Sequence, residues 1–290
     1  MHGIDQYQRA GSQAHAAVLF RLYNNLAMIC RVLGRVDEAE LAYITAVEFH
    51  DTHIGSSDPV SLAALYGNLA FLYHETGLGE AACDMQRLAI EMLKQHAPED
   101  KPERVNALRR AGIFAASAGR HAEAVRSFEA ARALLATVPK ISESIHIELL
   151  VCEGTSSLAL DLHEDALALY ERASTALQRR THPDELLLAL LENNIGCILL
   201  RQNRAEQALA ALNNAHDLLR GHPAADLVAR AEVLHNLALT HELLGNEKSA
   251  SQFRSTAHGV LACVSEEVRL MLSDCEARGQ SVPSSHIHRR

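Results

Sequence analysis

Small residues recur along the chain at a fixed interval, within stretches whose apolar positions have helical spacing. Three columns of Ala or Gly align when the sequence is shifted by about 42 residues, with successive steps of 43, 42, 42, 42 and 42. The first column is Ala27, Ala70, Gly112, Gly154, Gly196 and Ala238. The second is Ala39, Ala82, Ala124, Ala166, Ala208 and Ala250, and the third is Ala46, Ala89, Ala131, Ala173, Ala215 and Ala257. This periodicity predicts six copies of one structural unit.

Each unit is predicted to be a pair of antiparallel helices. Helix axes approach within about 8 to 10 Å where the contacting side chains are short. Between the first two columns lies a turn column of residues that tolerate the left-handed conformation ending a helix. Its members are Gly34, Gly77, Gly119, Asp161, Asn203 and Gly245. Acidic residues such as Glu38 and Glu123 follow, as the dipole of a second helix favours.

These patterns predict the organisation of the whole chain. We expect a polar N-terminal segment over 1–13, six repeats over 14–262, a capping helix over 263–278 and a flexible tail over 279–290. The repeats are expected at 14–55, 56–98, 99–140, 141–181, 182–222 and 223–262. The cap is indicated by apolar residues with helical spacing, such as Val264, Val268 and Met271. An open stack needs such an element to cover its last unit.

Composition supports a helical protein and disfavours some partners. Hydrophobic residues make up 48% of the 290 residues but aromatic residues only 4%, and 15 Gly and 7 Pro are few for an all-β fold. The net charge of −9 does not favour nucleic acid as a partner. The chain has no 18-residue apolar stretch and no secretion signal at its start, so we expect a cytoplasmic protein without a membrane partner. Six cysteines without a C-x-x-C pair are expected to be reduced thiols.

The sequence carries none of the usual catalytic or cofactor signatures. There is no phosphate-binding Gly-rich loop, no G-x-S-x-G and no H-E-x-x-H. The pairs His50 and His53, and His286 and His288, lack the ligand set of a built metal site. We therefore expect no catalytic residue, cofactor or metal. A strongly shifted pKa at Cys197 or His235 would favour an enzymatic interpretation instead.

The spacing inside one unit resembles the tetratricopeptide repeat (TPR). Tyr66-x-x-Leu69-Ala70-x-x-Tyr73, with Gly77, Ala82 and Ala89, matches the TPR order of aromatic, Leu, small, aromatic and two further small residues. HEAT and armadillo arrays have a similar period, but this internal spacing favours TPR. The longer units with Pro-containing linkers resemble the repeats of kinesin light chains, with Tyr23-Asn-Asn-Leu-Ala27 as the best match.

The resemblance covers about residues 14 to 260 and departs in two units. Ala111 and Glu153 stand where the repeat has an apolar Leu. The resemblance implies an all-α protein, a right-handed α-solenoid of about six TPR-like helical hairpins with a C-terminal capping helix. It also implies that the first helix of each hairpin lines a concave groove for a peptide.

Asparagine dominates the column one residue before the packing Leu. That column is Asn25, Asn68, Arg110, Cys152, Asn194 and Asn236. Kinesin-light-chain-like arrays contact bound peptide at these Asn positions, so the resemblance implies this role for Asn25, Asn68, Asn194 and Asn236. An amide can donate to and accept from a peptide backbone of any sequence. Alternatively, each Asn ties down a neighbouring helix. Both interpretations stay open on sequence alone.

Further polar and apolar residues are expected on the same groove. The polar ones are Arg21, Asn24, Asn106, Arg109, Asn193, Arg201 and His235. Together with Arg110, these arginines could bind an acidic segment through charge-assisted bonds, or they could pair with intramolecular Glu. Met28, Phe71 and Ile113 are candidates for apolar contacts, or equally for core residues.

The sequence thus predicts a non-enzymatic module that binds a peptide segment of a partner protein. A sensor or regulatory domain that controls an effector, on another chain or in a lost neighbouring domain, is the alternative.

Overall fold

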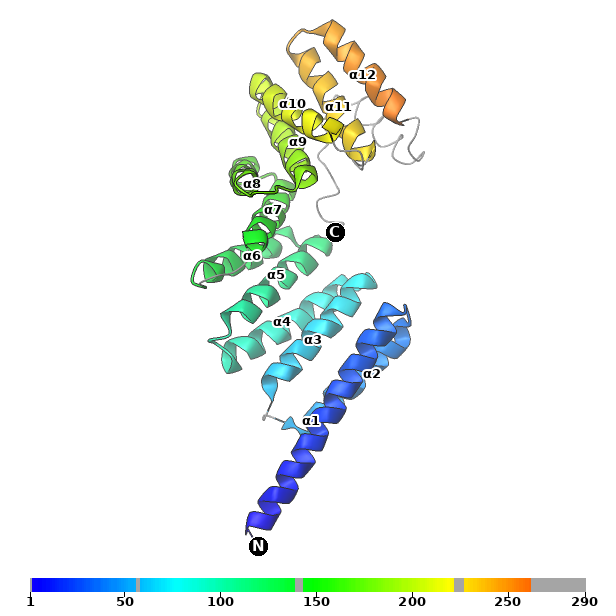
Figure 1. Cartoon of the computed structure of the whole chain (residues 1–290), viewed down its shortest axis with the longest axis vertical. Coiled ribbons are helices and arrows are strands. Elements are labelled where there is room, and N and C mark those ends of the chain that lie inside the picture. Colours follow the sequence, from blue (N-terminus) through cyan, green and yellow to red (C-terminus); the bar gives the residue numbers. More distant parts are fainter. Residues whose placement is uncertain (1, 56–57, 139–142, 222–226, 262–290) are drawn as a thin grey trace. The chain divides into compact units, whose positions relative to one another are not determined.

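The computed structural model describes residues 2–55, 58–138, 143–221 and 227–261. Over these ranges the chain forms twelve α-helices and no β-strand (Figure 1). The helices are α1 (His2–Val32), α2 (Val36–His53), α3 (Pro59–Glu75), α4 (Gly79–His96), α5 (Lys101–Ser117), α6 (His121–Leu135), α7 (Glu143–Ala159), α8 (His163–Gln178), α9 (Glu185–Arg201), α10 (Ala205–Gly221), α11 (Leu227–Leu243) and α12 (Glu247–Leu261).

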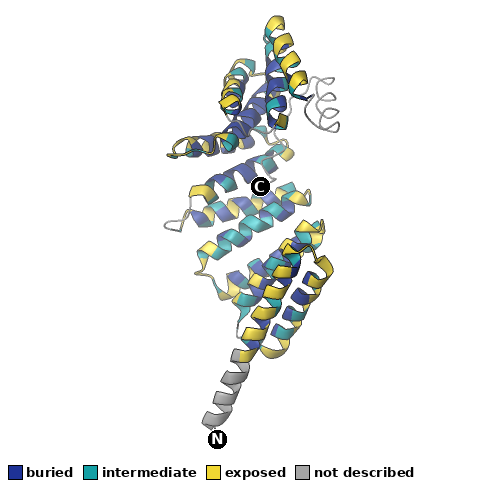
Figure 2. Ribbon diagram, turned by 45° about the vertical axis from the view of Figure 1, so that its right-hand side comes forward, coloured by how far each residue is buried: buried dark blue, intermediate teal, exposed yellow. Residues whose placement is uncertain are grey.

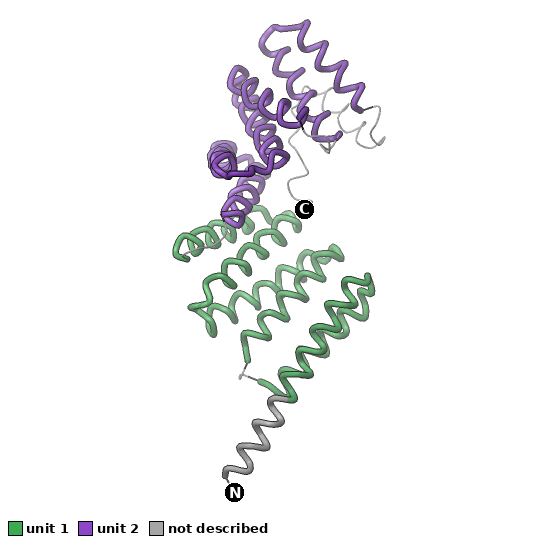
Figure 3. The backbone as a smooth tube through the Cα atoms, viewed as in Figure 1, with its two compact units in different colours: residues 1–142 green, residues 143–290 purple. Residues whose placement is uncertain are grey.

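The helices belong to two compact units, Met1–Ser142 and Glu143–Arg290 (Figure 3). Unit 1 contains the hairpins α1/α2, α3/α4 and α5/α6, and unit 2 contains α7/α8, α9/α10 and α11/α12. Within each unit, the second helix of a hairpin also packs against the first helix of the next hairpin. The predicted helical solenoid, in which hairpins stack on their neighbours, is confirmed.

The hairpin turns have the backbone that the turn column predicts. All six residues have positive φ, from 58° at Asn203 and 59° at Asp161 to 79° at Gly77. Glycine adopts this conformation without steric cost, and Asn and Asp are the residues that tolerate it best after glycine. Each turn therefore ends the first helix of a hairpin where the sequence predicts.

The columns of small residues lie in the interior, and the glycines of the first column face the second helix of their hairpin. All eighteen residues are buried. Three of them are glycines, and a Cβ added to Gly112 would lie 2.4 Å from Cε1 of Phe128. Real Cβ atoms do not come so close, so the Phe128 ring occupies the space that a side chain at position 112 would need. The small residue and the large one together set the helix crossing.

Aspartate residues start three of the first helices. Asp58, Asp100 and Asp184 each accept a hydrogen bond from the backbone N–H three residues later, at 3.1, 3.2 and 3.0 Å. Such caps satisfy one of the N–H groups that the first turn of a helix leaves without an intrahelical partner. The linkers that the sequence shows as breaks between repeats thus also begin the following helix.

The N-terminal end differs from the expected pattern, and the C-terminal end lies outside the described residues. Helix α1 begins at His2, so residues 2–13 are helical and extend the first helix upstream of residue 14. The other eleven helices each lie within one of the expected repeats. The expected capping helix over 263–278 and the tail over 279–290 lie outside the described residues.

Candidate functional site

Asparagine side chains link the first helices of consecutive hairpins in both units. In unit 1, Nδ2 of Asn68 on α3 donates to Oδ1 of Asn24 on α1 at 3.0 Å. In unit 2, Nδ2 of Asn236 on α11 donates to Oδ1 of Asn193 on α9 at 2.9 Å. The same contact thus joins hairpins one and two and hairpins five and six. These two bonds pair four of the residues that the sequence predicts for the groove, two in each unit.

In unit 1, the predicted residues of α1 face solvent. Asn25 and Arg21 are exposed, and Asn24 is half-buried. These residues and Met28 are spaced three or four apart, so they lie along one side of the helix. On the neighbouring helices, Asn68, Asn106, Arg109 and Arg110 are half-buried.

Apolar side chains accompany these polar groups. Met28 is 40% exposed and Phe71, its counterpart one repeat later, is 37% exposed, whereas Ile113 is half-buried. The Phe71 ring lies edge-on to Phe114 with centroids 6.4 Å apart. Met28 and Phe71 are therefore partly open to a ligand. We refer to Arg21, Asn25, Met28, Asn68, Phe71, Arg109, Arg110 and Ile113 together as the first-helix surface of unit 1.

Sequence patterns did not single out Arg31, which supports this surface. Its guanidinium carbon lies 4.8 Å from the centroid of the Phe71 ring, and its Nη1 lies 2.7 Å from Oε2 of Glu75. Both contacts run from α1 to α3, and a cation over an aromatic face is attractive. The sequence signal for this contact was the position of Arg31, three residues after Met28. The residue that corresponds to Met28 one repeat later is the aromatic Phe71.

The Arg110 guanidinium pairs with a neighbouring carboxylate and lies in space that Gly67 leaves open. Its Nη2 lies 3.0 Å from Oε1 of Glu103. A Cβ added to Gly67 would lie 3.4 Å from its guanidinium nitrogens, so the glycine leaves room for the Arg110 head group. Burial lowers the pKa of Arg110, while Glu103 opposes that shift. Here the intramolecular Glu partner that the sequence left open is present.

His74 lies beside the same aromatic cluster. Its ring centroid is 4.8 Å from that of Phe114, and burial lowers its pKa below the usual value while the nearby Glu75 opposes that shift. At neutral pH the His74 ring is therefore uncharged, because even an ordinary histidine is mostly neutral there.

In unit 2, the corresponding asparagines are buried. The exposed fractions of Asn193, Asn194 and Asn236 are 0%, 2% and 0%. Nδ2 of Asn236 lies 3.3 Å from Sγ of Cys197, and Asn194 hydrogen-bonds Tyr170, whose pKa rises to about 12 mainly through burial. Every residue over 188–200 of α9 is buried, whereas Arg201 is exposed and His235 is half-buried. The two units therefore present different surfaces from similar sequence motifs.

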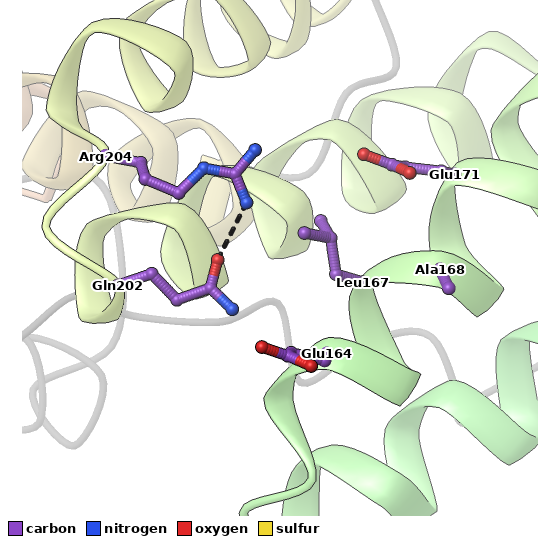
Figure 4. A pocket seen from close by; sticks show the side chains of 6 residues that line it. All are labelled: Glu164, Leu167, Ala168, Glu171, Gln202 and Arg204. Carbon is purple, nitrogen blue, oxygen red and sulfur yellow. Dashed lines mark hydrogen bonds between the residues drawn. The ribbon is translucent and has the colours of Figure 1, made fainter.

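Two surface hollows in unit 2 are lined by residues other than the predicted ones. One, of about 550 Å³, is lined by Glu164, Leu167, Ala168, Glu171, Gln202 and Arg204 (Figure 4). Nη1 of Arg204 donates to Oε1 of Gln202 at 2.9 Å on its rim. The other, of about 580 Å³, includes Glu185, Glu192 and Asp217.

The described residues offer neither a metal cluster nor a membrane span. No group of three or more His, Cys, Asp or Glu residues in the described ranges is placed to hold a metal ion. No described helix combines the length and the apolarity needed to span a membrane.

Comparisons with known proteins match single repeats and the fold. Two family models, both described as tetratricopeptide repeat, match residues 20–49 and 62–103. A comparison with curated proteins returns no matching sequence.

Several solved structures share the fold at low identity. The apo form of RapI aligns with a TM-score of 0.71 and 13% identity, covering 94% of this chain and 74% of RapI. BtubC (BKLC) from P. vanneervenii aligns with a TM-score of 0.61 and 16% identity, covering 88% and 91% of the two chains. TPR-like repeats of a putative kinesin light chain from Podosopora anserina align at 0.59 and 16%, covering 71% and 96%. The chain therefore carries tetratricopeptide repeats in its first two hairpins, and its fold is similar to that of known tetratricopeptide-like repeat proteins.

Proposed function

We propose that the chain is a non-enzymatic interaction module that binds a peptide segment of a partner protein on the first-helix surface of unit 1. The observation that carries this proposal is the exposure of Asn25, Met28 and Phe71 on consecutive first helices. An amide beside an apolar side chain suits a peptide, because the amide pairs with the backbone while the apolar group contacts a side chain.

The charge of this surface favours an acidic segment. Arg21, Arg31, Arg109 and Arg110 place four guanidinium groups on or beside it, against the carboxylates of Glu75 and Glu103 that pair with two of them. A carboxylate in the ligand could form a charge-assisted hydrogen bond with the exposed Arg21. This local excess of positive charge contrasts with the net charge of −9 of the whole chain.

For unit 2 we propose a different role for the asparagines. Asn193, Asn194 and Asn236 are buried and bonded to other side chains of the unit, which suits bracing of neighbouring helices. The exposed Arg201 and the half-buried His235 stay candidates for contact with a partner.

The proposal includes a cytoplasmic location. Cys30, Cys83, Cys152 and Cys197 are buried free thiols. Reduced cysteines packed as small apolar residues are typical of a reducing compartment.

The binding proposal can be tested before the natural partner is identified. Peptides selected against the wild-type chain from a random display library are titrated calorimetrically into wild type and into the Asn25→Ala/Met28→Ser variant. Because both side chains are exposed, the variant keeps its helical circular dichroism, and we expect binding at least tenfold weaker. The matched control is Asn213→Ala/Asn214→Ala, which removes two exposed asparagines from α10.

The selected peptides also test the charge argument. We expect enrichment in Asp and Glu, and binding that weakens between 50 and 300 mM NaCl, with a smaller salt effect in Arg21→Ala. Equal affinity of the peptides for wild type and Asn25→Ala/Met28→Ser would remove this surface from the site.

A further inference from the structure

Helix α1 exposes a stripe of apolar residues that later hairpins bury. We define the α1 stripe as Leu19, Leu22, Leu26 and Ile29 of the helix together with Leu33 in the turn that follows it. These side chains are 44%, 56%, 49%, 58% and 63% exposed. Figure 2 shows exposed residues along the described part of this helix. A contiguous apolar surface of this kind is uncommon on a monomeric protein and marks an interaction site.

The next hairpin shows what such a stripe does when it is covered. One repeat later, the positions of Leu19, Leu22, Leu26 and Ile29 hold Leu62, Leu65, Leu69 and Leu72. Those four are only 7%, 1%, 4% and 1% exposed, because α3 packs them into one core cluster with residues of α1 and α2. The α1 stripe therefore has the composition and spacing of a helix-packing surface, but no described element covers it.

Helix α2 also exposes apolar residues that a packing hairpin would not cover. Leu41 and Ile44 on α2 are 66% and 40% exposed. Their counterparts are Asp84 and Arg87 on α4, which stay exposed although the first hairpin packs against α3. A preceding hairpin of the same array would therefore cover the α1 stripe and leave Leu41 and Ile44 in water. Their apolar character indicates a larger interface.

The pattern of the stripe fits another helix of the same kind. Its members alternate steps of three and four residues, which is the spacing of the apolar seam in a two-helix coiled coil. From Leu19 to Leu33 the stripe runs for about 21 Å at about 1.5 Å per residue.

The charges near the stripe permit an identical surface as the partner. Between residues 15 and 33 the fixed charges are Arg21 and Arg31, and Arg31 is paired with Glu75. Arg21 lies on the side of α1 that carries Asn25 and Met28, about a third of a turn from the centre of the stripe. The stripe itself therefore carries no fixed charge that a second copy of it would repel, as a two-fold symmetric contact requires.

We propose that the α1 stripe is the dimerisation surface of the chain, and that a second copy covers it with its own α1 stripe. The exposed Leu41 and Ile44 of α2 lie at the edge of this interface. The proposal uses side chains other than those of the first-helix surface of unit 1, although Asn25 borders the stripe because it lies three and four residues from Leu22 and Ile29.

The test is the mass of the full chain in solution, by sedimentation velocity and light scattering between 1 and 200 µM. We expect wild type to have twice the monomer mass of 31.7 kDa. The variant Leu22→Glu/Ile29→Glu places two charges in the seam, so we expect its dimer dissociation constant to rise at least a hundredfold.

The control variant carries the same charges elsewhere. Leu78→Glu/Leu243→Glu replaces leucines that are 54% and 58% exposed, nearly the values at Leu22 and Ile29, and we expect it to remain a dimer. Circular dichroism verifies folding, and Leu22→Ser/Ile29→Ser replaces the Glu variant if that variant loses helicity. A monomeric wild type at 200 µM, or a dimer that survives the α1 substitutions, would overturn the proposal.

Discussion

At the scale of single residues, asparagines at equivalent positions of the repeat lie in different environments. Asn25 on α1 is exposed, whereas Asn236 on α11, which occupies the same column of the repeat, is fully buried and hydrogen-bonded to Asn193. When a buried hydrogen-bonding group is removed, its partners lose a hydrogen bond and water cannot reach them to replace it. Removing an exposed group costs little, because water takes its place. Position in the repeat alone therefore does not decide what an asparagine does.

This difference predicts opposite outcomes for the same substitution. Asn236→Ala should lower the free energy of unfolding by about 1–3 kcal/mol, because Asn193 and the polar groups around it stay buried. Asn25→Ala should change it by less than about 0.5 kcal/mol, as is usual for exposed sites. Urea unfolding followed by circular dichroism measures both. A similar loss of stability in the two variants would contradict the assignment of a bracing role to Asn236 and not to Asn25.

The sequence predicts the role of a residue where the backbone restricts the residue type. It does not predict the role of a residue whose burial or contacts depend on side chains elsewhere in the chain. The turn column and the small columns could be identified because a left-handed φ or a close helix crossing restricts the residue type wherever it occurs. The burial of Asn194 and the contact of Arg31 with Phe71 depend on side chains one repeat away. A single sequence lists those side chains without placing them.

At the scale of helices, three hairpins pair a glycine with a large residue across their crossing. Where the first small column has glycine, at Gly112, Gly154 and Gly196, the facing residue of the second helix is large: Phe128, Tyr170 and Leu212. The first two hairpins have Ala27 and Ala70 there. Glycine costs helix stability, so its use here is explained by the space that the facing side chain takes.

Two glycine substitutions should therefore change the free energy of unfolding in opposite directions. Gly112→Ala introduces a Cβ 2.4 Å from the Phe128 ring and should destabilise the chain by about 1–3 kcal/mol through overpacking. Gly259→Ala on α12 meets nothing within 4 Å and should stabilise it by about 0.5–1 kcal/mol, because alanine favours a helix. Thermal and urea unfolding measure both. Combining Gly112→Ala with Phe128→Leu should recover part of the loss, and no recovery would contradict the steric explanation.

Helix α1 shows where element-scale prediction from the repeat falls short. The repeat pattern starts the first unit at residue 14, but α1 continues upstream to His2. The polar sequence of residues 2–13 lacks the apolar positions on which the repeat is recognised, so periodicity cannot report a helix there. The exposure of the α1 stripe was hidden for a related reason: its spacing is that of a buried repeat helix, and only the structure shows that no described element covers it.

At the scale of the molecule, stability is expected to be a sum of neighbouring contacts. In unit 2, α8 packs against α7 in its own hairpin and against α9 in the next, while α11 packs against α12 and α10, and α12 packs against α11. In such arrays each repeat contacts only its neighbours, so a local defect opens nearby helices first. The unit therefore should not respond to a core substitution as one uniform block.

A pair of alanines two residues apart on α8 tests this view. Ala166 is 0% exposed and lies in the main core cluster of unit 2, whereas Ala168 is exposed. Ala166→Leu should cost about 1–3 kcal/mol by overpacking, and Ala168→Leu should cost almost nothing. Hydrogen exchange should show faster amide exchange in α7, α8 and α9 of Ala166→Leu, with a smaller change in α11 and α12. Equal acceleration in all six helices of unit 2 would instead show that the unit opens as a single cooperative block, since neighbour-limited opening cannot reach α12 as easily as α8.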